Sequence, residues 1–511
     1  MAETNTTKNS RIAKNTLFLY LRMFLVLVVS LFTTRIVLRA LGVEDYGINN
    51  VVCGFVSMFS FLNTSMSNGI QRFYNFKLGK EGEQSLTKVY NTALLIQVII
   101  AAIIVVFLET IGLWYVHNRM VIPAERLDVA LWIYQFAIVS LLLVVMQIPY
   151  SAAIMAHERM DYYAYVSIID VALKLAFALY LPYVHHDKLL IYGAFGLCVG
   201  LINFLMYYVY CKIKFKEIHL HRAFHKDLFK EMLSFSGWNI FGTFAYMLKG
   251  QGLNVLLNAF FGPVVNAARG VSMMIGNAIH GFQTNIVVSF RPQTVQSYAE
   301  GNSNRVKKLM YSLSKISYLM LFMLSMPVVI ELAYILHIWL GDVVPEYTIP
   351  FTILILAVMI LSSLNTPLSQ VVHATGKMRN YQVGTSIVIC AILPIAWGVL
   401  KLGGNPTSVY IVSIIMTIIN QEVCMVLLKK VFPYSIREYL KKVIWPCLWV
   451  SILATILPLG VHLLLPSSFL RLIIVAVLGV GSTAVISYYL AMDQTERQLV
   501  LDFVHKFFKK K

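Results

Sequence analysis

Apolar stretches of 18 or more residues recur along this chain from Leu17 to Leu490. Each is long enough to cross about 30 Å of hydrocarbon as an α-helix. The alternating pattern of a membrane β-barrel is absent, and helices satisfy their own backbone groups in lipid. Because 58% of the 511 residues are hydrophobic and only 13% are charged, water cannot surround most of the surface. The sequence therefore predicts an all-α membrane protein.

Fourteen apolar stretches separated by turn signals predict about fourteen transmembrane helices. The first is too long for the core of a signal peptide and is expected to remain in the protein. The six cysteines form no CxxC pair, so we predict neither disulfides nor a metal, and we expect no cofactor. The predicted spans are 16–38, 46–68, 89–114, 129–153, 163–184, 189–211, 234–259, 266–290, 312–339, 350–372, 382–401, 407–428, 443–465 and 469–491.

Basic residues are concentrated in alternate connections between these spans. By this placement about 30 of the 42 Lys and Arg residues lie on one side of the membrane and about 6 on the other. The positive-inside rule then places both termini in the cytoplasm. The net charge of +18 is spread over short connections, so we expect membrane lipids and no nucleic acid as partners.

An internal repeat relates the two halves of the chain. Pro149, Ser151 and the residues that follow them recur with an offset of 218 residues, beginning at Pro367. Gly42 after the first span corresponds to Gly262 after the seventh at nearly the same offset. Because the offset covers six spans, an even number, both halves keep the same orientation in the membrane. The repeat is therefore predicted to be parallel.

Four segments follow from this repeat. We predict two parallel six-helix bundles related by a pseudo-twofold axis along the membrane normal, followed by two C-terminal helices. Such bundles meet at a cleft where transporters bind substrate and alternate between inward-open and outward-open states. The segments are an N-terminal bundle (1–211), a cytoplasmic amphipathic basic linker (212–233), a C-terminal bundle (234–428), and two additional helices with a basic cytoplasmic tail (429–511).

Cationic and polar side chains inside the apolar spans are the candidate substrate-binding residues. A charge in hydrocarbon is costly, so it indicates a partner, an aqueous cavity or a function. Those of the seventh span share one helical face, and those of the eighth lie within an arc of about 80°. Arg22 and Arg291 could instead extend to the interface, and His280 could be a packing residue. The candidate set is Arg22, Asn239, Thr243, Lys249, Arg269, Asn277, His280 and Arg291.

Four further membrane residues are candidates for coupling transport to an ion. Asp170 and Lys174 are spaced i, i+4 in the fifth span, where they could also simply neutralise one another. Glu331 and Glu422 are isolated carboxylates within apolar stretches, which proton carriers require. No catalytic residue is predicted.

Several short sequences resemble the polysaccharide transporter branch of the MOP flippase superfamily, which is related to multidrug MATE exporters and the lipid II flippase. They are Thr34–Leu38 with Leu41–Gly47, Arg72–Tyr74 leading to Gly79, and Asn266–Arg269. The resemblance implies a bacterial inner-membrane flippase that moves undecaprenyl-pyrophosphate-linked oligosaccharides, the repeat units of O-antigen or capsule, to the periplasmic leaflet. It also implies a cationic central cavity, whose basic residues correspond to Arg22, Lys249 and Arg269. Other polysaccharide-assembly proteins are implied as partners.

Two alternative functions remain open on the sequence alone. An ion-coupled multidrug exporter of the MATE type would share the architecture, but cation exporters resemble proteins with acidic cavities. A membrane glycosyltransferase or polymerase would need an organised catalytic loop, and the longest predicted outer loop, 115–128, carries only Glu125 and Asp128 as carboxylates. No Walker A sequence is present, and we expect that the protein is not an enzyme.

Overall fold

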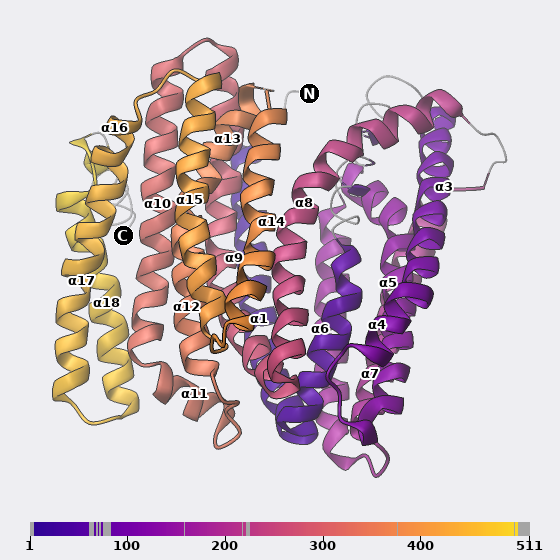
Figure 1. Ribbon diagram of the computed structural model, residues 1–511. Coiled ribbons are helices and arrows are strands. Elements are labelled where there is room, and N and C mark those ends of the chain that lie inside the picture. The colour runs from indigo at the N-terminus through magenta and orange to yellow at the C-terminus, as the bar shows by residue number, and fades with distance from the viewer. Residues whose placement is uncertain are drawn as a thin grey trace. The chain divides into compact units, whose positions relative to one another are not determined.

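The computed structural model describes residues 5–60, 66–67, 70, 73–74, 83–157, 159–216, 218–220, 225–375, 377–494 and 496–498. Every regular element among them is a helix (Figure 1). The prediction of an all-α membrane fold is confirmed. The chain folds into two units, residues 1–267 and 268–511.

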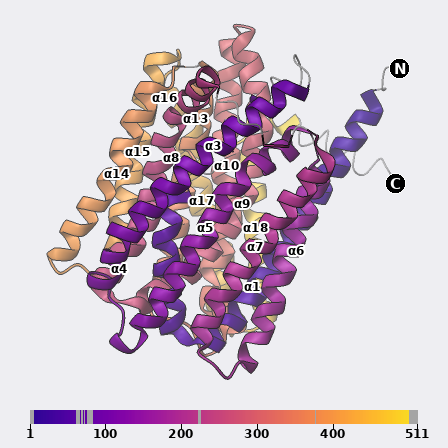
Figure 2. The ribbon, with the colours of Figure 1, turned by 90° about the vertical axis from the view of Figure 1, so that its right-hand side faces the viewer.

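Unit 1 contains the helices of the first predicted bundle together with the seventh predicted span. The long α8 packs against α1 and α3, which is why it joins this unit and why the division falls after the predicted boundary near residue 234. Helices α5 and α7 lie side by side (Figure 2). The bounds are α1 Asn5–Ser57, α3 Glu83–Phe107, α4 Leu113–Asn118, α5 Leu127–Ala156, α6 Met160–Tyr180, α7 Lys188–Lys214 and α8 Lys226–Phe261.

Unit 2 contains the remaining helices, beginning inside α9. The last two long helices, α17 and α18, form an antiparallel hairpin that packs against α10. The bounds are α9 Pro263–Ala299, α10 Ser303–Ile330, α11 Leu332–Leu340, α12 Thr348–Ser362, α13 Asn365–Thr375, α14 Arg379–Lys401, α15 Ser408–Val431, α16 Ile436–Tyr439, α17 Trp445–Leu464 and α18 Phe469–Leu490.

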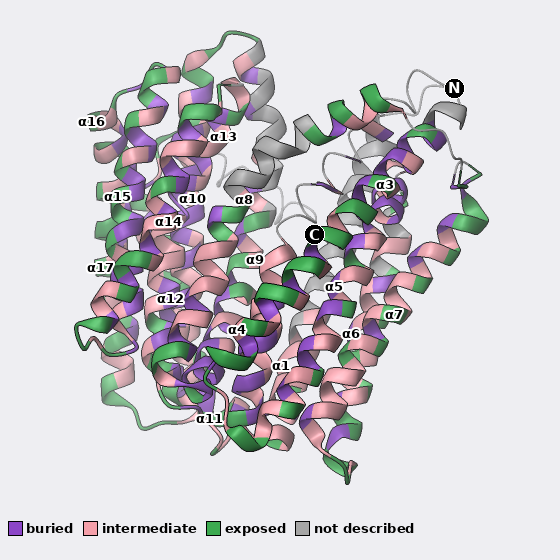
Figure 3. Ribbon diagram, turned by 45° about the vertical axis from the view of Figure 1, so that its right-hand side comes forward, coloured by how far each residue is buried: buried purple, intermediate pink, exposed green. Residues whose placement is uncertain are grey.

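Ten helices or continuous helical stretches among the described residues are long and apolar enough to cross a membrane. Exposed residues are distributed along the full length of the helices rather than only at their ends (Figure 3). Many of these exposed residues are large and apolar, including Trp449, Ile452 and Ile456 on α17. Lipid is the solvent that such a surface suits. The total of fourteen spans remains a prediction.

The glycines that were matched between the two halves adopt the same backbone conformation. Gly42 lies inside α1 at a kink with φ 82° and ψ 170°, and Gly262 follows α8 with φ 79° and ψ −174°. Only glycine adopts this region without strain, so each ends one helix and redirects the chain into the next. This equivalence agrees with the internal repeat inferred from the sequence.

Polar caps fix where several of these helices begin. The Asp187 side chain accepts hydrogen bonds from the backbone N–H groups of Leu189 and Leu190 at the start of α7. Ser468 accepts from Arg471 N at the start of α18. Such caps satisfy backbone donors that have no partner within the helix. The caps therefore fix the residues at which α7 and α18 begin.

Candidate functional site

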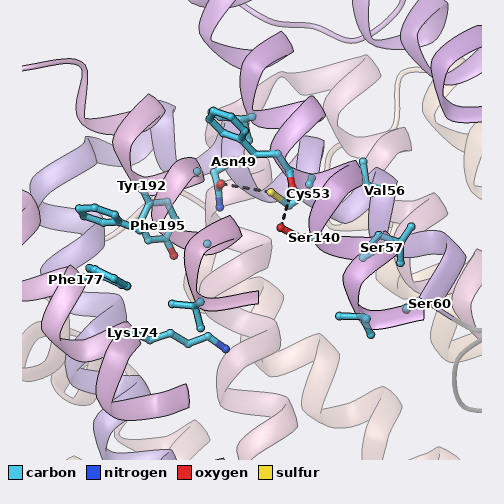
Figure 4. Close-up of a pocket in the computed structure, with 18 of the residues that line it drawn as sticks. Asn49, Cys53, Val56, Ser57, Ser60, Ser140, Lys174, Phe177, Tyr192 and Phe195 are labelled. Carbon is cyan, nitrogen blue, oxygen red and sulfur yellow. Dashed lines mark hydrogen bonds between the residues drawn. The ribbon is translucent and has the colours of Figure 1, made fainter. Parts of the chain in front are cut away.

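A cavity of about 450 Å³ lies within unit 1, between helices α1, α5, α6 and α7 (Figure 4). Its wall is mostly apolar, with hydroxyl and amide groups at intervals. The close-up shows Asn49 and Cys53 of α1 across the cavity from Phe177 and Phe195. The lining residues are Thr33, Asn49, Cys53, Val56, Ser57, Ser60, Ile133, Phe136, Ala137, Ser140, Leu141, Val144, Lys174, Phe177, Tyr192, Gly193, Phe195, Gly196 and Val199.

Lys174 on α6 is the only lysine or arginine among these lining residues, and no carboxylate is among them. Its Nζ lies 2.8 Å from Oδ2 of Asp170, so the two groups form the i, i+4 pair expected from their spacing. Asn203 of α7 donates to the other carboxylate oxygen of Asp170 at 2.7 Å. The Lys174 side chain nevertheless remains 56% exposed. Lys174 can thus present positive charge to a ligand in the cavity, while Lys174 and Asn203 together hold the Asp170 carboxylate.

The remaining wall combines stacked rings with weak hydrogen-bonding groups. Phe177 and Phe195 stack with ring centroids 4.4 Å apart. Opposite them, the Cys53 thiol donates to Oδ1 of Asn49 at 3.5 Å. An apolar cavity with a few polar groups is typical of small-molecule and cofactor sites. This arrangement suits a ligand that has an apolar body and an anionic or hydroxylated end.

The predicted substrate-binding residues of the first and seventh predicted spans lie on α1 and α8. Lys249 and Thr243 are both partly buried on α8. Neither lines the cavity of unit 1. Arg22 on α1 and Asn239 on α8 lie in helix as predicted, but their side chains are outside the described part of the structure. Their role in substrate binding remains a prediction.

The polar face predicted for α9 is divided in the structure. Asn277 and His280 are exposed, and the hydroxyl of Thr284, also exposed, donates to the His280 carbonyl oxygen at 3.2 Å. Arg269, in contrast, is only 6% exposed. The side chain of Arg291 is outside the described residues. Asn277, His280 and Thr284 are thus exposed, whereas tertiary packing buries Arg269. Their role in substrate binding remains a prediction.

Glu331, a candidate for coupling, lies in a buried ion-pair cluster in unit 2. Its carboxylate is fully buried and lies 2.7 Å from Arg471 of α18 and 2.8 Å from Nδ1 of His462 of α17. Arg471 also donates to the Leu465 carbonyl oxygen at 2.9 Å. The cluster joins the end of α10 to the α17–α18 hairpin, a role the sequence did not indicate. Glu422, the other isolated carboxylate, is exposed on α15.

A second ion-pair cluster connects three turns of unit 1. Arg126 pairs with Asp45 at 2.8 Å and also with Asp187, the cap of α7. Burial raises the pKa of the Asp45 carboxyl, and the adjacent Arg126 guanidinium opposes that rise. The three residues lie in the turns after the first, third and fifth predicted spans. These turns are predicted to lie on the same side of the membrane, and that is the only sign in the sequence that the three residues could meet.

Comparisons with known proteins identify the fold. No family model and no curated protein matches the chain. An inward-facing multidrug resistance MATE family transporter of the MOP superfamily matches with a TM-score of 0.64 and 12% identity, over 79% of this chain and 95% of that one. The lipid II flippase MurJ, in an inward closed conformation, matches with a TM-score of 0.66 and 14% identity, over 93% and 98%.

A third solved structure bears on the polarity of binding pockets in this superfamily. It is a MOP superfamily transporter from Pyrococcus furiosus, described as having a binding pocket of reversed polarity, with a TM-score of 0.56, 12% identity, and coverage of 81% of this chain and 95% of that one. At such identities the similarities concern the fold alone. The chain therefore has the multi-helical membrane fold that MATE transporters of the MOP superfamily share with the lipid II flippase MurJ.

Proposed function

We propose that this protein is a flippase that moves undecaprenyl-pyrophosphate-linked oligosaccharides from the cytoplasmic to the periplasmic leaflet. The observation that carries the proposal is the extent of the fold similarity. The match to the lipid II flippase covers 93% of this chain, whereas the matches to MATE structures cover 79–81%. A carrier of a lipid-linked cargo is thus similar over more of the chain than the drug exporters are.

The charges within unit 1 and unit 2 support an anionic rather than a cationic cargo. Asp170 is paired with Lys174, and Glu331 is enclosed by Arg471 and His462. Carboxylates held in this way are not open to a cationic drug. Exposed Lys174 and the amide and imidazole groups of α9 instead offer donors to phosphate and hydroxyl oxygens.

The proposed transport has a place and a direction. The excess of basic residues in alternate connections supports cytoplasmic termini and insertion in a bacterial inner membrane. Lys249, Arg269 and Arg22 are proposed to attract the diphosphate, and the polar residues Asn239, Thr243, Asn277, His280 and Arg291 are proposed to bind the substrate as well. Movement of a lipid between leaflets makes and breaks no covalent bond, so no catalytic residue is proposed.

Depletion of the protein in its own cells tests this function. Lipid-linked repeat units are expected to accumulate in the cytoplasmic leaflet while surface glycan disappears, and a plasmid copy should restore export. A strain that instead keeps normal surface glycan and becomes sensitive to cationic dyes would identify a multidrug exporter. Loss of the lipid-linked repeat units themselves would indicate a glycosyltransferase of the same pathway.

A further inference from the structure

Buried asparagines in unit 1 fix the end of α8 to the second half of α1. The Asn254 side chain donates to the carbonyl oxygen of Asn50 at 3.0 Å. Asn266, in the first turns of α9, donates to the Asn254 backbone oxygen at 2.7 Å and to its side-chain oxygen at 2.8 Å. Both Asn254 and Asn266 are buried. Amide groups therefore occupy positions where apolar side chains would pack at lower desolvation cost.

A third asparagine binds the turn between α4 and α5. Asn258 accepts from the backbone N–H of Val121 at 2.9 Å and donates to the carbonyl oxygen of the same residue at 3.1 Å. The Asn258 amide thus satisfies both the backbone donor and the backbone acceptor of Val121. Asn258 is 1% exposed, so the pairing is shielded from solvent. Asn254 and Asn258 lie four residues apart on α8, and Asn266 at the start of α9 is bonded to Asn254.

Two glycines let the helices approach closely beside these asparagines. A Cβ atom on Gly47 would lie 1.9 Å from the backbone oxygen of Pro263, at the start of α9. A Cβ on Gly54 would lie 2.6 Å from the Asn254 side chain. Gly47, Asn50 and Gly54 are three and four residues apart, so they share one face of α1. The contact therefore depends on small residues on one helix and amides on the other.

We infer that Asn50, Val121, Asn254, Asn258 and Asn266 form a reversible latch, which we call the asparagine latch. Asn254 joins α8, the first helix of the second repeat, to Asn50 of α1, and Asn258 joins it to Val121 in the turn between α4 and α5. Asn266 holds the Asn254 side chain from within the second repeat. All of these residues lie at the end of the helices expected to face the periplasm. Water can replace the hydrogen bonds that Asn254 and Asn258 make to the first repeat when the repeats separate there, whereas an apolar seam would expose apolar surface to water. The latch is thus suited to holding this end closed in one conformation and releasing it in another.

One acceptor already favours the released state. The side-chain oxygen of Asn266 is buried and accepts no hydrogen bond from the described residues. A buried acceptor without a donor costs free energy that solvation would recover. Opening of the latch therefore gains one hydrogen bond to water that the closed state lacks. The latch governs how the fold moves and does not depend on the cargo.

Spin-label distances test the latch in the full-length protein without substrate. Labels at Glu125 and Val264, which are both exposed, report on the separation of the α4–α5 turn from the start of α9. Asn258→Leu and Gly47→Ala should each add a longer distance and raise the ratio of open to closed protein by about tenfold. Gly250→Ala is the matched control, because a Cβ there meets nothing within 4 Å.

A second substitution covers the case in which Asn258→Leu does not fold. Asn258→Asp keeps the size and the acceptor but removes the donor to Val121, and it should produce a smaller shift in the same direction. Unchanged distances in Gly47→Ala together with either folded Asn258 variant would overturn the latch. A clear shift combined with failure to flip glycolipids would leave the latch standing and refute only the proposed cargo.

Discussion

The buried cluster around Glu331 should dominate the attachment of the α17–α18 hairpin to unit 2. Arg471→Ala would leave the Glu331 carboxylate, 0% exposed, without its guanidinium partner, while His462 would remain 2.8 Å away. Removal of one partner from a buried ion pair typically costs about 3–5 kcal/mol. We expect a loss of this size and a Tm lower by on the order of 10 °C. Tryptophan fluorescence during heating of detergent-purified protein measures it.

The exposed pair of Glu438 and Lys442 provides a matched control for this cluster. Their side chains are 41% and 61% exposed at a separation of 2.7 Å, so Lys442→Ala should cost only about 0.3–0.5 kcal/mol. The double variant Glu331→Leu with Arg471→Leu should recover much of the loss, because both buried charges disappear together. The reasoning is wrong if Arg471→Ala destabilises the protein no more than Lys442→Ala does.

Three other predictions address the turns, the candidate path and the topology. Arg126→Ala should destabilise unit 1 by about 1–3 kcal/mol in thermal unfolding, because it leaves the buried Asp45 without its partner. Arg119→Ala is the control: it removes a contact with the exposed Trp114 ring and should cost less than about 1 kcal/mol. Lys249→Glu and Arg269→Glu should each abolish surface glycan at normal levels of inserted protein, and Lys249→Arg should retain part of it; full export by both reversals would exclude the two residues from the path. Fused reporters test the orientation, and a consistent inversion beyond Gly262 would contradict the parallel repeat. Cytoplasmic signals are expected after Lys80, Lys226, Lys308 and Lys442, and periplasmic signals near Arg119, Asp187, Asp342 and Ser467.

Hydropathy predicted the fold class because membrane insertion depends on the composition of each helix separately. The kink at Gly42 and the turn at Gly262 were likewise predictable, since backbone conformations that require glycine leave a local mark in the sequence. Spacing also predicted the Asp170–Lys174 pair, whose members lie one helical turn apart. These features share one property: the interacting groups are close in sequence.

The contacts that the sequence did not reveal join residues far apart in the chain. Glu331 was read as an isolated carboxylate, whereas its partner Arg471 lies on the last helix. Lys315 pairs in the same way with Glu496, at 2.6 Å. Helical periodicity places such residues on one face of their own helix, but it does not identify the helix that packs against that face. The asparagine latch was hidden for that reason, since Asn258 meets a backbone group that carries no sequence signature.

Flipping of a defined glycolipid by the purified protein tests the central proposal most directly. The protein would be reconstituted into vesicles that contain undecaprenyl-pyrophosphate-linked oligosaccharide, and a membrane-impermeant enzyme that modifies the glycan would report the fraction in the outer leaflet. Because exchange keeps replacing the modified molecules of the outer leaflet, we predict that nearly all of the glycolipid becomes modified in vesicles with the protein. In empty vesicles and in vesicles with Lys249→Glu, modification should stop at about half, the share present in one leaflet of a symmetric bilayer. Equal exposure with and without the wild-type protein, under conditions in which it is folded and inserted, would contradict the proposed function.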